Sequence, residues 1–160
     1  MNCLGPGKRP YHTIIPAMVT AEKRLHTVFG VMGGYMQPQG HVQVLLNMLA
    51  FGMDPQQALD APRVCVGPGY TGTGGGGKEG PGEDGPVVVS LEVGMPDGVV
   101  QGLRDMGYEV VVLGGGDGAG RSVFGRGQII RNESAGGEGK GRQLWRGGSD
   151  MRGDGACVGY

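Results

Sequence analysis

The 160-residue sequence has few cysteines and almost no net charge, and each absence excludes a class of protein. Its three cysteines, Cys3, Cys65 and Cys157, lie far apart without CxxC spacing, so we expect inert or buried thiols rather than a disulfide framework or a zinc site. Fourteen basic residues balance 15 acidic ones, which is not the basic excess typical of nucleic-acid binding. We therefore expect neither a nucleic-acid partner nor a bound metal.

Long apolar runs are also missing from the sequence. None approaches the ~20 residues that a membrane-spanning helix needs, so no membrane span is predicted. No charged segment followed by an apolar one opens the chain, so no signal peptide is predicted either. These observations do not assign a compartment.

Glycine, in contrast, is abundant, at 37 of 160 residues, which is about three times its usual ~7% share. Three clusters, residues 67–85, 114–120 and 136–141, hold much of the excess and are predicted to be flexible surface loops, because glycine loses the most backbone entropy on ordering. The sequence between them is densely patterned. Its length suits one domain, residues 1–160, with enlarged loops.

The apolar pattern between the loops predicts an α+β fold with strands and helices in mixed order. We expect strands over residues 13–20, 25–31, 63–66, 86–92, 108–113, 122–131 and 143–146, and helices over residues 39–51, 54–61 and 96–106. The first helix carries two apolar stripes, one with Val42 and Leu46 and the other with Val44 and Met48. Such a helix is expected to pack against more than one layer. The strands are expected to form a mixed sheet.

Two short motifs match known sites only weakly. Residues 72–78 complete GxxxxGK, but Glu79 follows where a phosphate-binding loop needs Ser or Thr to hold Mg²⁺. Residues 152–154 read Arg-Gly-Asp, a tripeptide that arises often by chance in a glycine-rich tail. Neither motif supports a functional prediction.

The Gly33–Gly34 pair is a stronger candidate for a site. It follows a predicted strand and precedes the long helix. Without Cβ atoms, such a step can turn its backbone N–H groups toward one point, where they would stabilise an oxyanion. A plain tight turn is the alternative that these residues leave open.

His12 and Thr13 form a second candidate, at the start of an apolar run. Adjacent residues of a strand point to opposite faces, which argues against a direct catalytic dyad between them. Two interpretations are left: a substrate clamp, or hydrogen bonds that close the end of a strand.

Six segments together resemble the C-terminal part of the γ-glutamyltransferase (glutathione hydrolase) family of N-terminal-nucleophile (Ntn) hydrolases. The similarity runs in order along nearly the whole chain outside the glycine loops. The segments are KRPYHTIIP, FGVMGGYMQPQGHVQVLLNML, FGMDPQQALDAPR, LEVGMPDGVVQGLRDMGYEV, FGRGQIIR and GSDMRGDGACVGY.

The resemblance implies a fold and a reaction. Family members cleave themselves at an internal threonine, which becomes the N-terminal nucleophile of the small subunit and uses its own amine as base. An acyl-enzyme forms from a small amide substrate, and water or an amino acceptor then takes the acyl group without a cofactor. The implied fold is a four-layer αββα sandwich shared by both subunits, of which this chain would be an incomplete part.

The resemblance also assigns roles to the two candidate pairs. The family's oxyanion glycines match Gly33 and Gly34. Typical members resemble PLSSM where this chain has PYHTI, so His12 and Thr13 replace a serine pair that binds the α-carboxylate of the γ-glutamyl group. Thr13 keeps a hydroxyl donor, and the ring N–H of His12 can also donate. A γ-glutamyl amide such as glutathione is the expected substrate, and related acyl groups, of the oxamate or cephalosporin type, are the alternative.

The family nucleophile matches no residue of this chain, since it lies well upstream of the KRP motif in relatives. Two hypotheses follow. In the first, the chain is the C-terminal piece of an enzyme and needs the large-subunit region or a partner chain. In the second, it is a catalytically inactive paralogue that acts as a binding or structural module.

Overall fold

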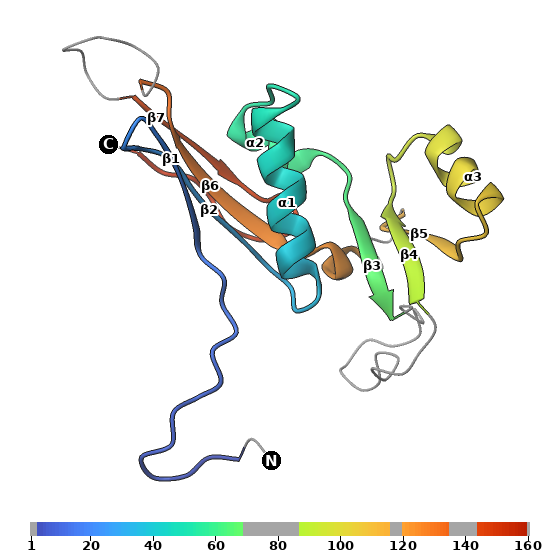
Figure 1. The fold of residues 1–160 in the computed structure, drawn as a ribbon, viewed down its shortest axis with the longest axis horizontal. Helices are drawn as coiled ribbons and strands as arrows, with labels where there is room; N and C mark the ends of the chain where they lie inside the picture. The colour runs from blue at the N-terminus through green and yellow to red at the C-terminus, as the bar shows by residue number, and fades with distance from the viewer. Residues whose placement is uncertain (1–2, 69–86, 116–119, 135–143, 160) are drawn as a thin grey trace.

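The computed structural model describes residues 3–68, 87–115, 120–134 and 144–159, and its strands form two sheets (Figure 1). The elements are β1 (Ala17–Ala21), β2 (Arg24–Met32), α1 (Met36–Leu49), α2 (Pro55–Asp60), β3 (Val64–Pro68), β4 (Val87–Glu92), α3 (Asp97–Asp105), β5 (Val110–Leu113), the 3₁₀ helix η1 (Arg121–Phe124), β6 (Arg126–Asn132) and β7 (Trp145–Ser149). One sheet is antiparallel with the order β1-β2-β6-β7, and the other has the order β3-β4-β5.

These sheets confirm the predicted α+β class and correct one part of it. The three-stranded sheet is mixed, since β4 pairs antiparallel with β3 and parallel with β5. The mixed sheet predicted from the strand pattern holds only for β3-β4-β5, because strand pairing is a non-local property that such patterns do not contain. The presence of two sheets agrees with the sandwich that the family resemblance implies.

Residues 67 and 68, the start of the first glycine cluster, belong to β3 rather than to a loop. The rest of that cluster with the GxxxxGK motif, residues 116–119 of the second cluster and all of the third lie outside the described residues.

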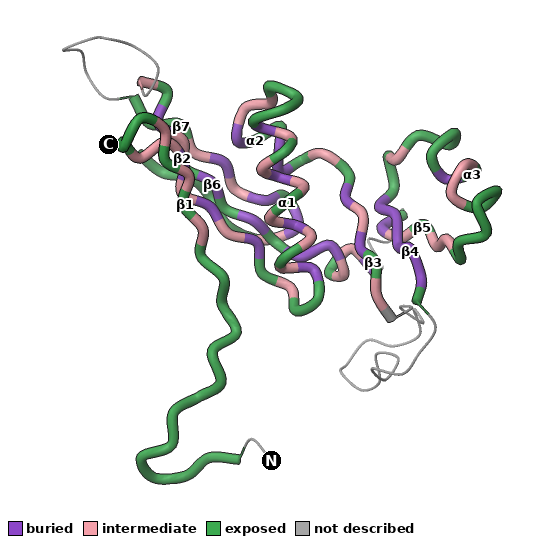
Figure 2. The backbone as a smooth tube through the Cα atoms, viewed as in Figure 1, coloured by how far each residue is buried: buried purple, intermediate pink, exposed green. Residues whose placement is uncertain are grey.

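The β1–β2 hairpin forms as predicted but begins later. Its turn places Glu22 and Lys23 at φ values of +50° and +63°, the left-handed pair that matches the twist of a tight hairpin. The predicted strand start at Thr13 is wrong, because regular pairing begins only at Ala17. Residues 3–16 are an extended, largely exposed segment, and Pro16 lacks the N–H that would continue the ladder (Figure 2).

Helix α1 starts earlier than its predicted boundary and is buried on one stripe only. Pro38 lies in its first turn, where the backbone N–H groups have no helical acceptor in any case. Val44 and Met48 are buried, whereas Val42 and Leu46 are exposed. Helix α1 does contact both sheets, since Val44 packs on the antiparallel sheet and Gln43 bonds to Val64 of β3. The second apolar stripe, however, is uncovered within the described part of the chain.

The main core lies between α1, α2 and one face of the antiparallel sheet. Its buried members are Phe29, Val31, Val44, Met48, Ala58, Leu59 and Ile129. Helix α1 approaches β2 closely at Gly40, where a Cβ atom would lie 2.7 Å from Val31 Cγ1. Helix α2 begins as predicted, with Asp54 accepting from the Gln57 N–H at 2.9 Å in a capping box and Pro55 at the first position.

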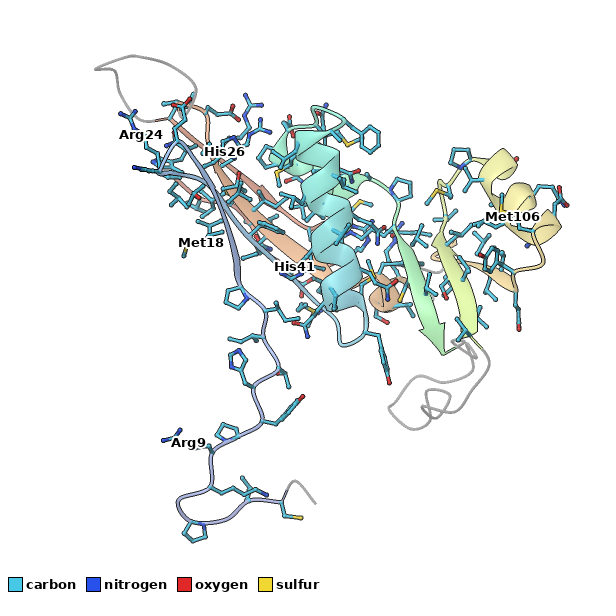
Figure 3. All side chains as sticks on the ribbon, viewed as in Figure 1. Arg9, Met18, Arg24, His26, His41 and Met106 are labelled. Carbon is cyan, nitrogen blue, oxygen red and sulfur yellow. The ribbon has the colours of Figure 1, made fainter. Side chains whose placement is uncertain are left out.

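The opposite face of the antiparallel sheet presents apolar side chains to solvent. Met18, Met32, Ile130 and Trp145 are exposed there, and Met18 projects from β1 away from α1 (Figure 3). The register places Met18 beside Val28 and Val28 beside Ile130, so these residues share one face. We refer to this surface as the outer face.

None of the described helices is long and apolar enough to cross a membrane. The three thiols are unpaired, as predicted, but only Cys65 is buried, and burial raises its pKa.

We predict that Val44→Ala lowers the free energy of unfolding by about 2 kcal/mol, because it leaves a cavity between α1 and the sheet. Val44 is 1% exposed, whereas Val42 on the same helix is 56% exposed. Val42→Ala is therefore the matched control and should change stability by less than about 0.5 kcal/mol. Urea unfolding monitored by circular dichroism measures both. Equal losses in the two variants would contradict the packing of α1.

Candidate functional site

The Gly33–Gly34 turn joins β2 to α1 and is closely packed against the start of β6. Its two glycines have φ values of +128° and +57°. A Cβ atom on Gly33 would lie 2.8 Å from Gly125 Cα, and one on Gly125 would lie 2.1 Å from the Met32 carbonyl oxygen. Only glycine fits positions 33 and 125, which hold the turn at a fixed place beside the sheet.

In this turn the carbonyl oxygens accept hydrogen bonds, whereas the N–H groups donate none to the described residues. The carbonyl oxygens of Gly33 and Gly34 accept from the N–H groups of Met36 and Gln37, at 3.0 and 3.1 Å. Within the described ranges, the N–H groups of Gly33 and Gly34 donate to no other residue. They lie just before the first turn of α1, the positive end of its dipole. Two donors are thus available near a region of positive potential.

One pocket brings three of the four predicted site residues together. His12 and Thr13, on the extended N-terminal segment, line it together with Gly34, and its volume is about 590 Å³. The remaining lining residues are Tyr11, Ile14, Ile15, Tyr35, Gln37 and Pro38. Gly33 lies next to this lining. The prediction that His12 and Thr13 belong to a strand was wrong, because this segment lacks regular structure.

Two side chains of α1, neither of them predicted, hold the N-terminal segment in place. Gln37 Nε2 donates to the Thr13 carbonyl oxygen at 2.8 Å. His41 Nε2 lies 2.6 Å from the Ile15 carbonyl oxygen, and its Nδ1 lies 2.6 Å from that of Gln37. These contacts join residues 24 and 26 positions apart in the sequence and involve main-chain oxygens, so no side-chain motif predicts them.

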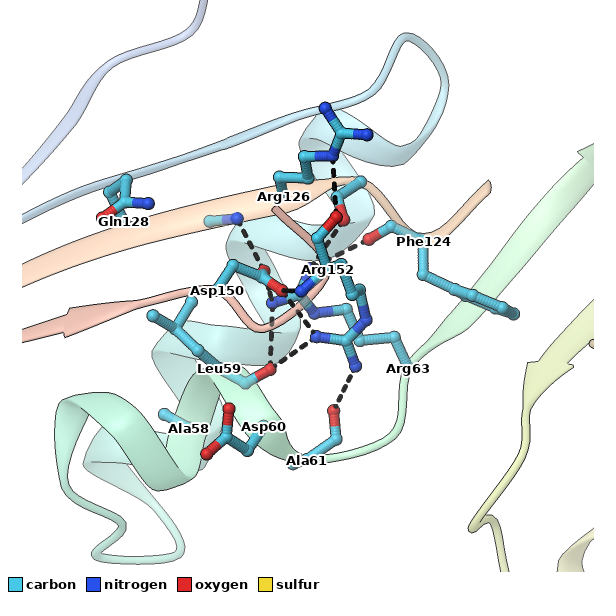
Figure 4. Close-up of polar contacts among 12 residues, drawn as sticks. Ala58, Leu59, Asp60, Ala61, Arg63, Phe124, Arg126, Gln128, Asp150 and Arg152 are labelled. Carbon is cyan, nitrogen blue, oxygen red and sulfur yellow. Dashed lines mark hydrogen bonds and ion pairs between the residues drawn. The ribbon is translucent and has the colours of Figure 1, made fainter. Parts of the chain in front are cut away.

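A buried network of four charged residues lies next to Gly125, the neighbour of the turn, and Figure 4 shows three of them, Arg63, Asp150 and Arg152. Arg63 Nη2 contacts Asp150 at 2.6 Å, and Arg152 contacts both Asp150, at 3.0 Å, and Glu92. Arg63 Nη1 also donates to the Phe124 carbonyl oxygen at 2.9 Å. The network therefore joins the C-terminal segment to β4, to the end of α2 and to the start of β6, the strand on which the glycine turn packs.

Hydrogen bonds and burial act in opposite directions within this network. Burial alone would raise the pKa of Asp150, but the N–H of Arg152, the charge of Arg63 and the N–H of Gly127 together lower it. Burial and the charge of Arg152 lower the pKa of Arg63. For Arg152 the hydrogen bond and charge of Glu92 outweigh burial and raise the pKa. The Arg-Gly-Asp tripeptide thus begins with a buried, fully engaged arginine.

From the sequence alone, members of this network could have been suspected only because they are charged residues. Arg63, Glu92 and Arg152 sit in segments that the family resemblance covers, yet no spacing rule connects them. In the described part of the chain, no cluster of His, Cys, Asp and Glu could hold a metal ion.

Comparison with known proteins gives one consistent match. The sequence model described as gamma-glutamyltranspeptidase matches residues 1–160. The chain is 34% identical over 159 residues to the glutathione hydrolase-like YwrD proenzyme of Bacillus subtilis, covering 99% of this chain and 26% of that protein.

Two solved structures agree with this match. Cephalosporin acylase from Bacillus halodurans superposes with a TM-score of 0.66 at 37% identity, over 98% of this chain and 25% of that one. The Helicobacter pylori gamma-glutamyltranspeptidase T380A mutant superposes with a TM-score of 0.63 at 22% identity, over 94% of this chain and 66% of that one, a likeness of fold. The chain spans about a quarter of the length of the YwrD proenzyme and of the acylase.

We predict that Asp150→Asn destabilises the fold by about 3 kcal/mol, because it leaves the Arg63 guanidinium buried without its anion. The lowered pKa of Asp150 means that its contribution is present above the unfolded-state pKa of about 3.9 and is lost as pH falls through the folded-state value. The loss of stability on acidification should therefore be smaller in the variant.

Urea unfolding between about pH 6 and about pH 3 measures both effects. Asp105→Asn, at an exposed position on α3, is the control and should leave the unfolding free energy near that of the unmodified chain. A loss in Asp150→Asn no greater than in this control would contradict the role given to the network.

Proposed function

Because the chain belongs to the γ-glutamyltranspeptidase family, we propose that it forms the oxyanion-stabilising and acyl-binding part of an amide hydrolase or acyltransferase. The nucleophile in this proposal is a threonine encoded upstream of Met1, in a large-subunit-like precursor. The observation that carries it is the Gly33–Gly34 turn, whose N–H groups are available beside a pocket that His12 and Thr13 also line. The fold is the Ntn-hydrolase fold of the structural relatives.

The proposed reaction assigns each group one task. The threonine hydroxyl attacks the substrate amide carbon, and the threonine's own amine takes the hydroxyl proton. The N–H groups of Gly33 and Gly34 donate to the oxygen that becomes negative. These hydrogen bonds stabilise the transition state most when the donors are already in place. The amide C–N bond then breaks and the amine leaves with the proton. Water or an amino acceptor finally releases the acyl group.

The N-terminal segment supplies the clamp in this proposal. The Thr13 hydroxyl and a ring N–H of His12 are donors for a polar group on the acyl part of the substrate. Gln37 and His41 fix the carbonyl oxygens of Thr13 and Ile15, so the clamp keeps its place relative to the glycine turn. A γ-glutamyl amide is the first substrate to test. The similarity to a cephalosporin acylase supports testing other acyl groups beside it.

The second candidate function is a non-catalytic module that binds a partner. The exposed outer face favours it, because contiguous apolar surface marks a contact with another protein segment. In both proposals another segment covers the outer face. It is the large-subunit-like region of the same precursor in the first proposal and a separate chain in the second.

The transcript that contains Met1 separates the two proposals. If an in-frame region upstream encodes a large-subunit-like segment followed by the threonine, the longer product should cleave itself and hydrolyse an amide. If the message begins at Met1, the chain alone should hydrolyse no γ-glutamyl amide, and the binding role is the one to pursue.

We predict that Gly34→Ala in the longer product slows acyl-enzyme formation by about 10²–10³-fold, because a displaced N–H no longer meets the oxyanion. Gly52→Ala is a closely matched control. Gly34 and Gly52 have φ values of +57° and +67°, and a Cβ atom meets nothing within 4 Å at either. Single-turnover kinetics measures the effect. Equal slowing in both variants would show that backbone strain alone explains the loss.

We also predict that Ile130→Lys lowers the binding of an apolar dye to the 160-residue chain while changing its stability by less than about 0.5 kcal/mol. Ile130 lies in the middle of the outer face and is half exposed. In the longer product the same change should reduce folding yield, because a charge then meets the covering segment. Met106→Lys, at an exposed apolar position directly after α3, is the control. Unchanged dye binding in Ile130→Lys would contradict the exposure of this face.

A further inference from the structure

His41 lies on α1 close to the point where the N-terminal segment enters β1 (Figure 3). Its Nε2 lies 2.6 Å from the carbonyl oxygen of Ile15, and its Nδ1 lies 2.6 Å from that of Gln37, one turn earlier in the helix. A carbonyl oxygen can only accept a hydrogen bond, so each ring nitrogen needs a proton of its own to bond here. Both nitrogens of the His41 ring therefore face acceptors.

A neutral imidazole cannot satisfy both contacts. It carries one N–H group, and its other nitrogen presents a lone pair. Whichever nitrogen keeps the proton, the other then places its lone pair against a carbonyl oxygen 2.6 Å away, which is unfavourable. Only the imidazolium, with a proton on each nitrogen, donates to both oxygens. The geometry thus selects the doubly protonated ring.

The surroundings of the His41 ring favour a positive charge without neutralising it. The ring centroid of Phe29 lies 5.3 Å from that of His41, within the ~6 Å over which an aromatic ring attracts a cation. Apart from His41, α1 has no charged or titratable residue, and β1 has none. On β2, Arg24 and His26 alternate with Phe29 along the strand, so their side chains lie on the opposite face.

No carboxylate in the described part of the chain pairs with His41. The other elements that pack near α1 carry titratable groups with contacts of their own: Asp54, Asp60, Cys65, Arg121 and Arg131. On the N-terminal segment, His12 and Tyr11 are the titratable side chains nearest in sequence to Ile15. Because no carboxylate holds the ring in its charged form, the ring can lose a proton in the range where histidine changes charge, roughly pH 5 to 8.

The segment that His41 holds is exposed. Ile14 and Ile15 are 65% and 47% exposed, and regular strand pairing begins only at Ala17. Gln37 donates a second hydrogen bond, to the Thr13 carbonyl oxygen, which does not depend on pH because an amide does not titrate. Loss of a proton from His41 thus weakens one of two contacts between α1 and the segment and leaves the other.

We propose that His41 holds the N-terminal segment as an imidazolium, so that docking of the His12–Thr13 clamp beside the glycine turn is coupled to the uptake of a proton. The inference rests on the proposed function for the role of the clamp. Docking is complete at low pH. It weakens as pH rises, because the Ile15 carbonyl oxygen loses its donor. His41 is a positioning residue, since it acts on the substrate through the segment.

The four isoleucines of the sequence make this docking measurable. Ile14 and Ile15 lie on the segment, whereas Ile129 and Ile130 lie on β6 and serve as internal references. NMR relaxation of ¹³C-labelled isoleucine methyl groups in the 160-residue chain measures the order of each, since methyl groups do not exchange with water. We expect the released fraction of the segment to rise about tenfold between about pH 5.5 and about pH 8, because a charge-assisted hydrogen bond is lost.

Ring-nitrogen spectra connect the loosening to one residue. The sequence has three histidines, His12, His26 and His41, so the His41 signals can be assigned by their absence from His41→Gln. The ¹⁵N pattern of a doubly protonated ring should accompany the docked segment. Both should disappear together as pH rises.

Variants separate the charge from the contact. In His41→Gln the segment should dock equally at both pH values, because an amide donates to the Ile15 carbonyl oxygen without carrying a charge. His41→Phe keeps a ring beside Phe29 but has no donor, so the segment should be released at both. His12→Gln and His26→Gln are the matched controls and should keep the full pH dependence.

Three results would overturn the proposal: order at Ile14 and Ile15 that does not change with pH, a pH dependence that persists in His41→Gln, or a neutral His41 ring in the docked state. A loss of order at Ile129 as large as that at Ile15 would also overturn it, because the whole fold would then be loosening.

The longer product distinguishes this inference from the proposed function. Its KM for an amide should rise with pH more steeply than that of the His41→Gln product, a comparison in which the titration of the nucleophile's own amine cancels. Hydrolysis by a product whose segment does not respond to pH removes this inference alone. A segment that responds to pH in a product without hydrolysis removes the proposed function alone.

Discussion

The buried pairing of Arg63 and Arg152 with Asp150 and Glu92 is the constraint on which the other features depend. Four charges removed from water are tolerated only when each is paired and hydrogen-bonded, so their geometry is narrowly defined. The network joins the last described segment to β4, to α2 and to the start of β6. It thereby sets where Gly125 lies, and Gly125 is the neighbour that holds the Gly33 turn in place.

The candidate site is built around that fixed point by two different means. The glycine turn is held by backbone contact, since neither Gly33 nor Gly125 has room for a Cβ atom. The N-terminal segment is held by side chains, through Gln37 and His41, without the support of a sheet. In the proposed function, a rigid turn beside a segment fixed at two points would hold the substrate amide in one position relative to the oxyanion donors.

Local sequence was sufficient to predict the structure wherever a single short-range interaction determines it. Asp54 and Pro55 predict the start of α2 because the cap, the fixed φ and the reciprocal bond to Gln57 lie within four residues. The candidate pair Gly33–Gly34 could be named for the same reason. The buried side of α1 could not be predicted from the sequence, because both stripes are apolar. Only the position of the sheet decides that Val44 is buried and Val42 is exposed.

Family membership, the α+β composition and the candidate residues Gly33, Gly34, His12 and Thr13 were therefore determined by the sequence. The tertiary structure decided which strands pair, that Arg152 of the Arg-Gly-Asp tripeptide is buried, and that His41 contacts the segment that carries His12 and Thr13. The reason is separation along the chain. The partners of Arg152 lie up to 93 residues away, and pairing at that range is set by the packing of whole elements rather than by neighbouring residues.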